Sequence, residues 1–144
     1  MREILFRGKR LDNSTWAEGS LSMEYFRECG CVMISPTSDT CYKVEPETVG
    51  QFTGLTDKRG KKVFEHDMIR HRFGDEIGVI RFGQYRNSFG DDEFGGHIGF
   101  YVAWIAGTYP QILRKDLGYW MKMEEVIGNI HDNPELLEVG VDGN

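Results

Sequence analysis

Glycine content is the feature that most constrains the fold, because 18 of the 144 residues are glycine and only 4 are proline. Glycine weakens helix interiors and permits the positive φ angles of tight turns. Several of the apolar stretches between turn residues alternate with a period of two, which is typical of β-strands. The sequence therefore predicts a mainly β protein (α+β at most) with short strands and glycine-rich loops.

Turn residues divide the chain into expected elements. Residues 2–21 alternate around polar clusters and predict a β-hairpin. The segment 56–62 is rich in Asp, Gly and Lys and predicts a turn, and the segments 63–73 and 75–85 are each predicted as one strand. Further strands are expected at 100–107 and around Val126, and Asn133 and Pro134 predict the start of a short C-terminal helix.

Size and charge place limits on domain organisation and function. A chain of 144 residues fits one domain, 1–144, with the option of a smaller β lobe from the N-terminal third. The net charge of −6 argues against nucleic-acid binding through overall charge. The N-terminal stretch lacks the apolar region of a secretory signal, and no stretch approaches the ~20 apolar residues of a membrane helix. We therefore expect a cytoplasmic protein without membrane association.

Three stretches together are specific enough to indicate a family. They are ILFRGKRLDNSTWAEG (4–19), VEPETVGQFTGLTDKRGKKVFEHDMI (44–69) and EEVIGNIHDNPELL (124–137). With these stretches the chain resembles the YopX family of phage and prophage proteins. The resemblance implies a mainly β fold with a small SH3-like barrel or roll and a place in the bacterial host cell. It implies no catalytic residue. The family usually has glycine where this chain has His66, which puts a tight backbone turn there in question.

The stretch around His66 holds candidate acid–base residues. On a single strand over 63–73, Glu65 and Asp67 share one face and His66 lies on the other. His71 would share the face of Asp67, but about 13 Å along the strand at ~3.3 Å per residue, which is too far for a shared metal ion. The pair either serves a metal-dependent enzyme with a histidine, or has structural roles in the adjacent turns. We favour the structural roles.

A basic cluster is the second candidate site. Its members are Lys58, Arg59, Lys61, Lys62, Arg70 and Arg72. It would contact nucleic acid or a partner, with Phe64 and Phe73 available for stacking on bases, or form a solvated turn that protects a strand edge.

The cysteines and one acidic loop are weaker candidates. Cys29, Cys31 and Cys41 would supply three zinc ligands and need His97 or His131 as a fourth, but their spacing matches no known zinc motif, and reduced structural thiols are favoured. Residues 91–93 are acidic but lack the spacing of a calcium-binding loop, so a solvated loop is favoured. No phosphate-binding loop or nucleophile elbow is present. We assign no catalytic, cofactor or metal residue.

Together with the resemblance, these observations favour a phage- or prophage-derived accessory protein that is a binding module and not an enzyme. Its expected partner is a protein or a second copy of itself, because Trp16, Trp104 and Trp120 belong to a rich aromatic set that can form an interface. The alternative is a nucleic-acid-associated protein of phage replication or recombination.

Overall fold

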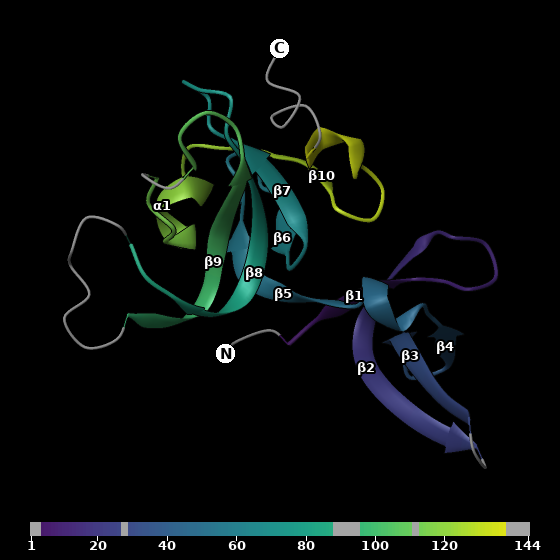
Figure 1. The fold of residues 1–144 in the computed structure, drawn as a ribbon. Coiled ribbons are helices and arrows are strands. Elements are labelled where there is room, and N and C mark those ends of the chain that lie inside the picture. The colour runs from purple at the N-terminus through teal and green to yellow at the C-terminus, as the bar shows by residue number, and fades with distance from the viewer. Residues whose placement is uncertain (1–3, 27–28, 88–95, 111–112, 138–144) are drawn as a thin grey trace. The chain divides into compact units, whose positions relative to one another are not determined.

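The structure, a computed structural model, describes residues 4–26, 29–87, 96–110 and 113–137 and divides into two compact units (Figure 1). The first unit is Met1–Gly54 and the second is Leu55–Asn144. Two antiparallel sheets account for most of the described residues, so the predicted mainly β class is confirmed. Within these ranges the sheets remain open and no barrel closes, unlike the SH3-like barrel that the resemblance implied.

The elements follow one another along the chain in an order dominated by strands. In the first unit they are β1 (Phe6–Lys9), β2 (Trp16–Phe26), β3 (Cys29–Thr37), β4 (Thr40–Lys43), the 3-10 helix η1 (Pro46–Thr48) and β5 (Gly50–Thr56), which runs past the boundary. In the second unit they are β6 (Lys62–Phe64), β7 (Asp67–Arg70), β8 (Ile77–Tyr85), β9 (His97–Ala106), α1 (Leu117–Met121) and β10 (Val126–Asn129).

The first unit is an antiparallel sheet in the order β4-β3-β2-β1-β5. Its N-terminal strands β1 and β2 form the predicted hairpin, with Phe6 opposite Gly19 and Lys9 opposite Trp16. Alternate side chains point to one face, where Ala17, Ile34 and Val44 are buried together. This small apolar cluster is the core of the unit.

The second unit is built on a four-stranded antiparallel sheet in the order β10-β7-β8-β9. The helix α1 packs against β9 and covers one face (Figure 1). There Leu117, Trp120 and Met121 of α1 join the buried side chains of the strands, which are Val63, Ile69, Ile80, Val102 and Trp104. Burial of these large apolar groups is the main stabilising contribution to this unit.

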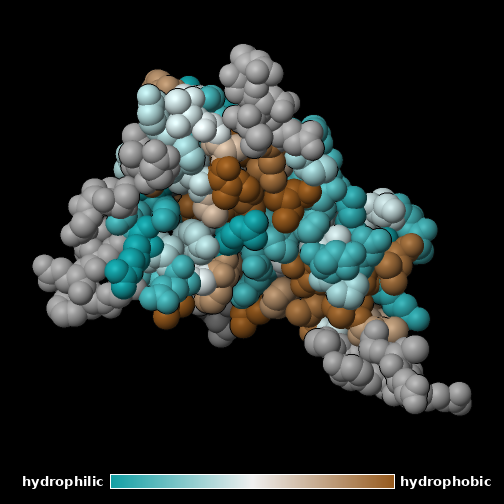
Figure 2. Space-filling model, in the orientation of Figure 1, coloured by the Kyte–Doolittle hydropathy of each residue, from teal (hydrophilic) through white to brown (hydrophobic). Residues whose placement is uncertain are grey.

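The chain that follows β10 covers the other face of the same sheet. Met68, Ile77, Val79 and Ala106 form a second buried cluster, against which Ile130, Leu136 and Leu137 pack. Residues 135–137 are helical directly after Pro134, as predicted. Figure 2 shows apolar side chains at the surface of this unit, over the strands at its centre. Among the described residues, no helix has both the length and the apolar character that crossing a membrane requires.

The prediction of one strand over 63–73 was wrong. The chain forms the strand β6, turns at Glu65 and His66, and continues as the separate strand β7. His66 adopts a φ of 80°, in the left-handed region that is uncommon for residues other than glycine. The turn is held because the His66 backbone N–H donates to the Ile80 carbonyl and its carbonyl accepts from the Ile130 N–H. The period-two pattern could not reveal this break, because both halves are strands.

Candidate functional site

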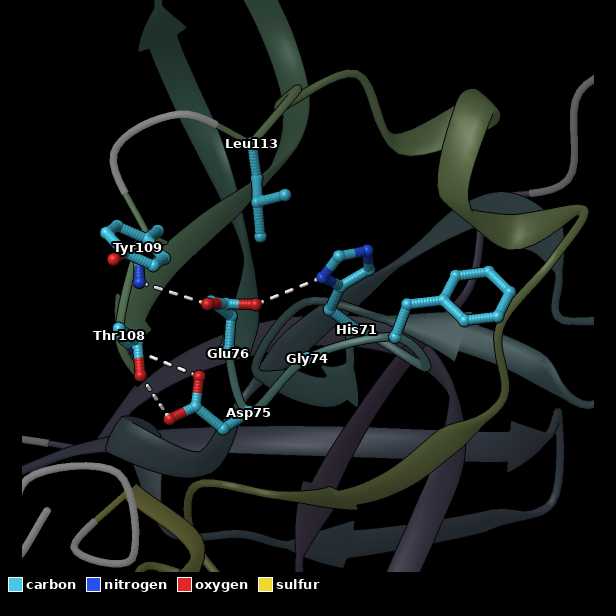
Figure 3. A pocket seen from close by; sticks show the side chains of 8 residues that line it. His71, Gly74, Asp75, Glu76, Thr108, Tyr109 and Leu113 are labelled. Atoms are coloured by element: carbon cyan, nitrogen blue, oxygen red, sulfur yellow. Dashed lines mark hydrogen bonds and ion pairs between the residues drawn. The ribbon is translucent and has the colours of Figure 1, made fainter.

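The turn between β7 and β8 brings an imidazole and a carboxylate together. The His71 N–H donates to the Glu76 carbonyl over 3.0 Å, and the Gly74 N–H donates to the His71 carbonyl over 3.1 Å. These bonds close the hairpin loop and place both side chains on one side of it (Figure 3). His71 Nδ1 lies 3.0 Å from Glu76 Oε1, within hydrogen-bonding distance.

Glu76 is buried, with 5% of its surface exposed, and its position depends on two glycines. A Cβ at Gly74 would lie 2.3 Å from Glu76 Oε1, and a Cβ at Gly107 would lie 2.5 Å from the Glu76 Cα. Gly107 also has a φ of 112°. The second carboxylate oxygen, Oε2, accepts a hydrogen bond of 3.0 Å from the Tyr109 N–H. The carboxylate is therefore held from both sides.

Asp75 joins the same turn to the segment after β9. Its two oxygens accept from the Thr108 N–H over 2.9 Å and from the Thr108 hydroxyl over 2.7 Å. Hydrogen bonds from the Thr108 hydroxyl and backbone hold the pKa of Asp75 below its usual value. Asp75 is therefore ionised at neutral pH.

Two tryptophans of the core support the imidazole. The His71 ring centroid lies 5.4 Å from that of Trp120 and 6.3 Å from that of Trp104, both in edge-on geometry. Both indole N–H groups donate to the Arg114 carbonyl, over 2.9 Å from Trp104 and 2.5 Å from Trp120. The His71 imidazole therefore packs against two indole rings whose positions are fixed by hydrogen bonds and by the core.

These groups surround a pocket of about 430 Å³ (Figure 3). We call it the carboxylate pocket, and it is lined by His71, Phe73, Gly74, Asp75, Glu76, Thr108, Tyr109 and Leu113. Phe73 is 84% exposed and Tyr109 is 59% exposed, so both offer aromatic surface to a ligand. The pocket can accept hydrogen bonds at its carboxylates and contact apolar or planar groups with its aromatic and leucine side chains.

The sequence did not identify this pocket. From the sequence we expected His71 to be too far from Asp67 to share a metal ion with it, and we assigned no role to Asp75, Glu76 or Tyr109. A charged residue directly before the apolar run IGVI, as Glu76 is, was a usable signal, because a buried carboxylate needs hydrogen-bond partners. One of its partners, His71, is five residues earlier, but the other, the Tyr109 N–H, lies 33 residues further along the chain, and no local pattern connects it to Glu76.

Part of the predicted basic cluster does gather. Lys58, Arg70 and Arg72 line a second pocket of about 280 Å³. We call it the mixed-charge pocket, because Glu124 and Glu125 line it as well, with Met123 and Ile127. Lys61 and Lys62 are exposed and are not among its lining residues.

Acidic groups offset the charge of this cluster. The Arg72 N–H donates to Glu124 Oε2 over 3.1 Å, and its guanidinium Nε lies 3.7 Å from the same oxygen. Arg59 Nε lies 3.3 Å from Glu125 Oε1, and the Arg59 side chain is largely in solvent whereas that of Glu125 is 42% exposed. These ion pairs lower the local positive charge that phosphate binding would need.

The predicted face shared by Glu65 and Asp67 does not exist, because the turn at His66 separates them onto different elements. Asp67 is 1% exposed and accepts a hydrogen bond of 2.8 Å from the Phe64 N–H, which is a structural role in the turn. His66 instead meets His131, with Nδ1 and Nε2 3.1 Å apart.

Asp57 is a second residue whose importance the sequence did not reveal. Its carboxylate accepts from the N–H groups of Arg59, Lys61 and Val126 over 2.9, 3.0 and 2.9 Å. Burial opposes its ionisation, but these three bonds outweigh burial and keep the pKa of Asp57 below its usual value. The turn predicted at 56–62 is confirmed, and Asp57 fastens it to β10.

The remaining candidates are not brought into either pocket. Cys31 and Cys41 are free thiols on β3 and β4. His97 lies on β9 with its ring 5.2 Å from that of Tyr85. The acidic residues 91–93 and the side chain of Cys29 lie outside the described part of the chain. Trp16 is approached by the Arg7 guanidinium at 4.7 Å from its ring centre.

Residues 5–138 match the family described as YopX protein. The chain belongs to the YopX family. The match includes the carboxylate pocket and the mixed-charge pocket, and it confirms the family that the three sequence stretches indicated. No curated protein matches the chain. Where the YopX resemblance led us to expect glycine, His66 takes the left-handed conformation itself, so the tight turn is present in this chain.

Proposed function

We propose that this member of the YopX family is a phage- or prophage-derived accessory protein that binds a protein partner and has no enzyme activity. It acts inside the bacterial host cell, and its binding site is the carboxylate pocket. One observation carries the proposal: hydrogen bonds hold two carboxylates in a pocket of about 430 Å³, beside aromatic side chains that remain exposed. The polar groups of such a site are preorganised for a ligand.

The fixed carboxylates support binding because a preorganised site loses little conformational entropy on association. Glu76 is held by His71 and the Tyr109 N–H, and Asp75 is held by Thr108. The glycines at positions 74 and 107 leave room for Glu76 without strain. A partner therefore meets polar groups whose positions are already determined.

The exposed aromatic groups support a protein as the partner. Phe73 and Tyr109 are mostly in solvent, although aromatic side chains gain free energy when they are buried. Protein interfaces are enriched in such residues at their centres. A protein segment that covers Phe73 and Tyr109 while entering the pocket would bury both.

The hydrogen-bond pattern favours binding over covalent catalysis. A nucleophilic hydroxyl is normally activated by a histidine within hydrogen-bonding distance. The Thr108 hydroxyl donates to Asp75, whereas His71 is paired with Glu76. The hydroxyl and the imidazole are therefore not arranged as nucleophile and base.

Site-specific photocrosslinking in bacterial host cells tests the proposal. Benzoylphenylalanine in place of Tyr109 is expected to form a covalent adduct with the partner, and the mass of the adduct distinguishes another protein from a second copy of this chain. The matched control places the same group at Phe82, which is also exposed but lies on β8, outside the pocket lining.

The expected result is an adduct at position 109 that is absent at position 82 and is lost when Phe73→Ser is added. Adducts of equal yield at both positions would contradict a specific site. Saturable turnover of a substrate by the purified protein would overturn the proposal that the module is not an enzyme.

Association with nucleic acid in phage replication or recombination is the second candidate function. Its supporting observation is that Lys58, Arg70 and Arg72 line one pocket. Glu124 and Glu125 in the same lining weigh against it, because they repel phosphate.

Labelled single- and double-stranded oligonucleotides, titrated across salt, test this candidate. Phosphate contacts would make binding weaken steeply as salt rises. The Lys58→Glu, Arg70→Glu double variant should then lose binding, while Lys43→Glu, Arg81→Glu, with the same change in charge at exposed positions elsewhere, should retain it. Equal binding by the two variants would reject the mixed-charge pocket as the contact.

A further inference from the structure

We propose that the group which enters the carboxylate pocket is a guanidinium, presented by an arginine side chain of the partner. This inference rests on the proposed function, and it adds the chemical identity of the bound group. It follows from the charge of the pocket, the acceptors that Glu76 and Asp75 retain, and the aromatic and apolar surfaces around them.

The charge of the pocket lining favours a cation. Two of its side chains, Asp75 and Glu76, are carboxylates, and no lysine or arginine occurs among the described residues that line it. Two neighbouring carboxylates repel each other when both are ionised, and Glu76 is also buried. A cationic ligand removes this repulsion, whereas an anionic ligand would increase it.

The carboxylates keep unused acceptor positions. An ionised carboxylate has about four lone-pair sites on its two oxygens. In Glu76, Oε1 faces His71 and Oε2 accepts from the Tyr109 N–H, which leaves each oxygen able to accept again. Asp75 accepts one bond per oxygen from Thr108, and its carboxylate also interacts with the Glu76 side chain. A guanidinium carries five N–H donors in a planar fork, so it can use several of these acceptors together.

The apolar parts of the lining suit an arginine side chain beyond its charged end. A guanidinium plane stacks on aromatic rings, and Tyr109 presents its ring to solvent. The exposed Phe73 ring already has the Arg72 guanidinium 5.5 Å from its centroid, so it accepts such a contact within this chain. Leu113 offers an apolar contact for the methylene stem. The volume of about 430 Å³ is at the small end of ligand pockets, which range from about 300 to 1,000 Å³, and suits one long side chain with its flanking backbone.

Titration of the full chain with short blocked peptides tests the inference. The probe is acetyl-Gly-Arg-Gly-amide, and its matched control is the citrulline peptide, which has nearly the same shape without the charge. Lysine and glutamate peptides of the same length test point charges of each sign. The ¹⁵N-resolved shifts of the Thr108 and Tyr109 amides report occupancy directly, because these N–H groups donate to Asp75 and Glu76. Tryptophan fluorescence gives a second readout, because Trp104 and Trp120 contact His71.

The expected result is binding of the arginine peptide at least tenfold tighter than the citrulline peptide, with shifts at Thr108 and Tyr109. Asp75→Asn should weaken the arginine peptide at least threefold. Glu47→Gln, an exposed acidic position in the first unit, should leave its affinity unchanged. Asp75 is exposed, so its substitution tests the charge without disturbing the core.

Equal binding of the arginine and citrulline peptides would overturn the inference and leave the proposed binding module standing, because the pocket would still take a peptide. Tighter binding of the lysine peptide would overturn the guanidinium assignment in favour of an ammonium. If no peptide shifts the Thr108 and Tyr109 amides, the inference fails. The proposed function fails with it only if the photocrosslink at position 109 is also absent.

Discussion

Asp57 accepts a hydrogen bond of 2.9 Å from the backbone N–H of Val126, although 69 positions separate the two residues in the sequence. The same carboxylate organises its own turn through the N–H groups of Arg59 and Lys61. One side chain thus shapes the turn that precedes β6 and holds the first residue of β10 against it. Asp57 is 6% exposed, and loss of its carboxylate would remove the acceptor that all three backbone N–H groups share.

We expect Asp57→Asn to lower the free energy of unfolding by about 1–3 kcal/mol, because an amide replaces one accepting oxygen with a donor and leaves a backbone N–H unpaired. Urea denaturation of the two proteins measures the difference. Asp39→Asn, at an exposed position in the first unit, is the control and should change stability by less than about 0.5 kcal/mol. An equal effect of both substitutions would show that the Asp57 bonds contribute nothing specific.

The Asp57 carboxylate should also make the free energy of unfolding depend on pH in the acidic range. The pKa of Asp57 is lower in the folded protein than in the unfolded chain, so the unfolded chain takes up the proton first as the pH falls. The stabilisation is present above the unfolded pKa and is lost as the pH falls through the folded pKa. Between about pH 5 and about pH 2, the wild type should therefore lose stability faster than Asp57→Asn. Parallel curves of unfolding free energy against pH for the two proteins would contradict this assignment.

The two glycines next to Glu76 should differ in how costly they are to replace. A Cβ at Gly107 meets the Glu76 backbone and must adopt a φ of 112°, whereas a Cβ at Gly74 meets the end of the Glu76 side chain. We expect Gly107→Ala to destabilise the protein by about 2–4 kcal/mol and Gly74→Ala by about 1 kcal/mol. Urea denaturation measures both.

Gly74→Ala should still alter the pocket, because it displaces the carboxylate that accepts from Tyr109, and the Tyr109 amide shift should change. The control is Gly118→Ala in α1, where a Cβ would meet nothing within 4 Å. There alanine should stabilise the helix by about 0.5–1 kcal/mol. If the Glu76 side chain, and not its backbone, were the rigid part, Gly74→Ala would destabilise the protein more than Gly107→Ala.

His66 should tolerate glycine better than alanine. Both substitutions remove the imidazole that meets His131, but only alanine keeps a Cβ at a φ of 80°. We expect His66→Gly to be more stable than His66→Ala by about 1 kcal/mol. At His97, the first residue of β9, the order should be the opposite, because its φ is not positive and glycine loses more conformational freedom on folding than alanine does. Equal stability of the two His66 variants would mean that the turn relaxes to a negative φ.

Much of the strand pattern could be predicted because it depends on neighbouring residues. The alternation over 75–85 predicts β8, the Asp-Gly-Lys segment predicts the turn after β5, and Pro134 marks the start of the helical residues 135–137. The break at His66 was missed because the left-handed conformation of a histidine has no local sequence signal. It depends on Ile80 and Ile130, which bond its backbone from other segments.

The sequence alone determined the mainly β class, the family and most of the turns, because strand alternation and turn chemistry act over a few residues. Only the tertiary structure decided which charged residues meet. Hydrogen bonds between residues 33 positions apart join Asp75 to Thr108 and Glu76 to Tyr109. A separate backbone bond, from the Lys58 N–H to the Glu124 carbonyl, brings those two residues together. Burial then decides what each charge does: Glu76 and Asp57 need fixed donors because water is excluded from them, whereas Lys61 and Lys62 remain in solvent.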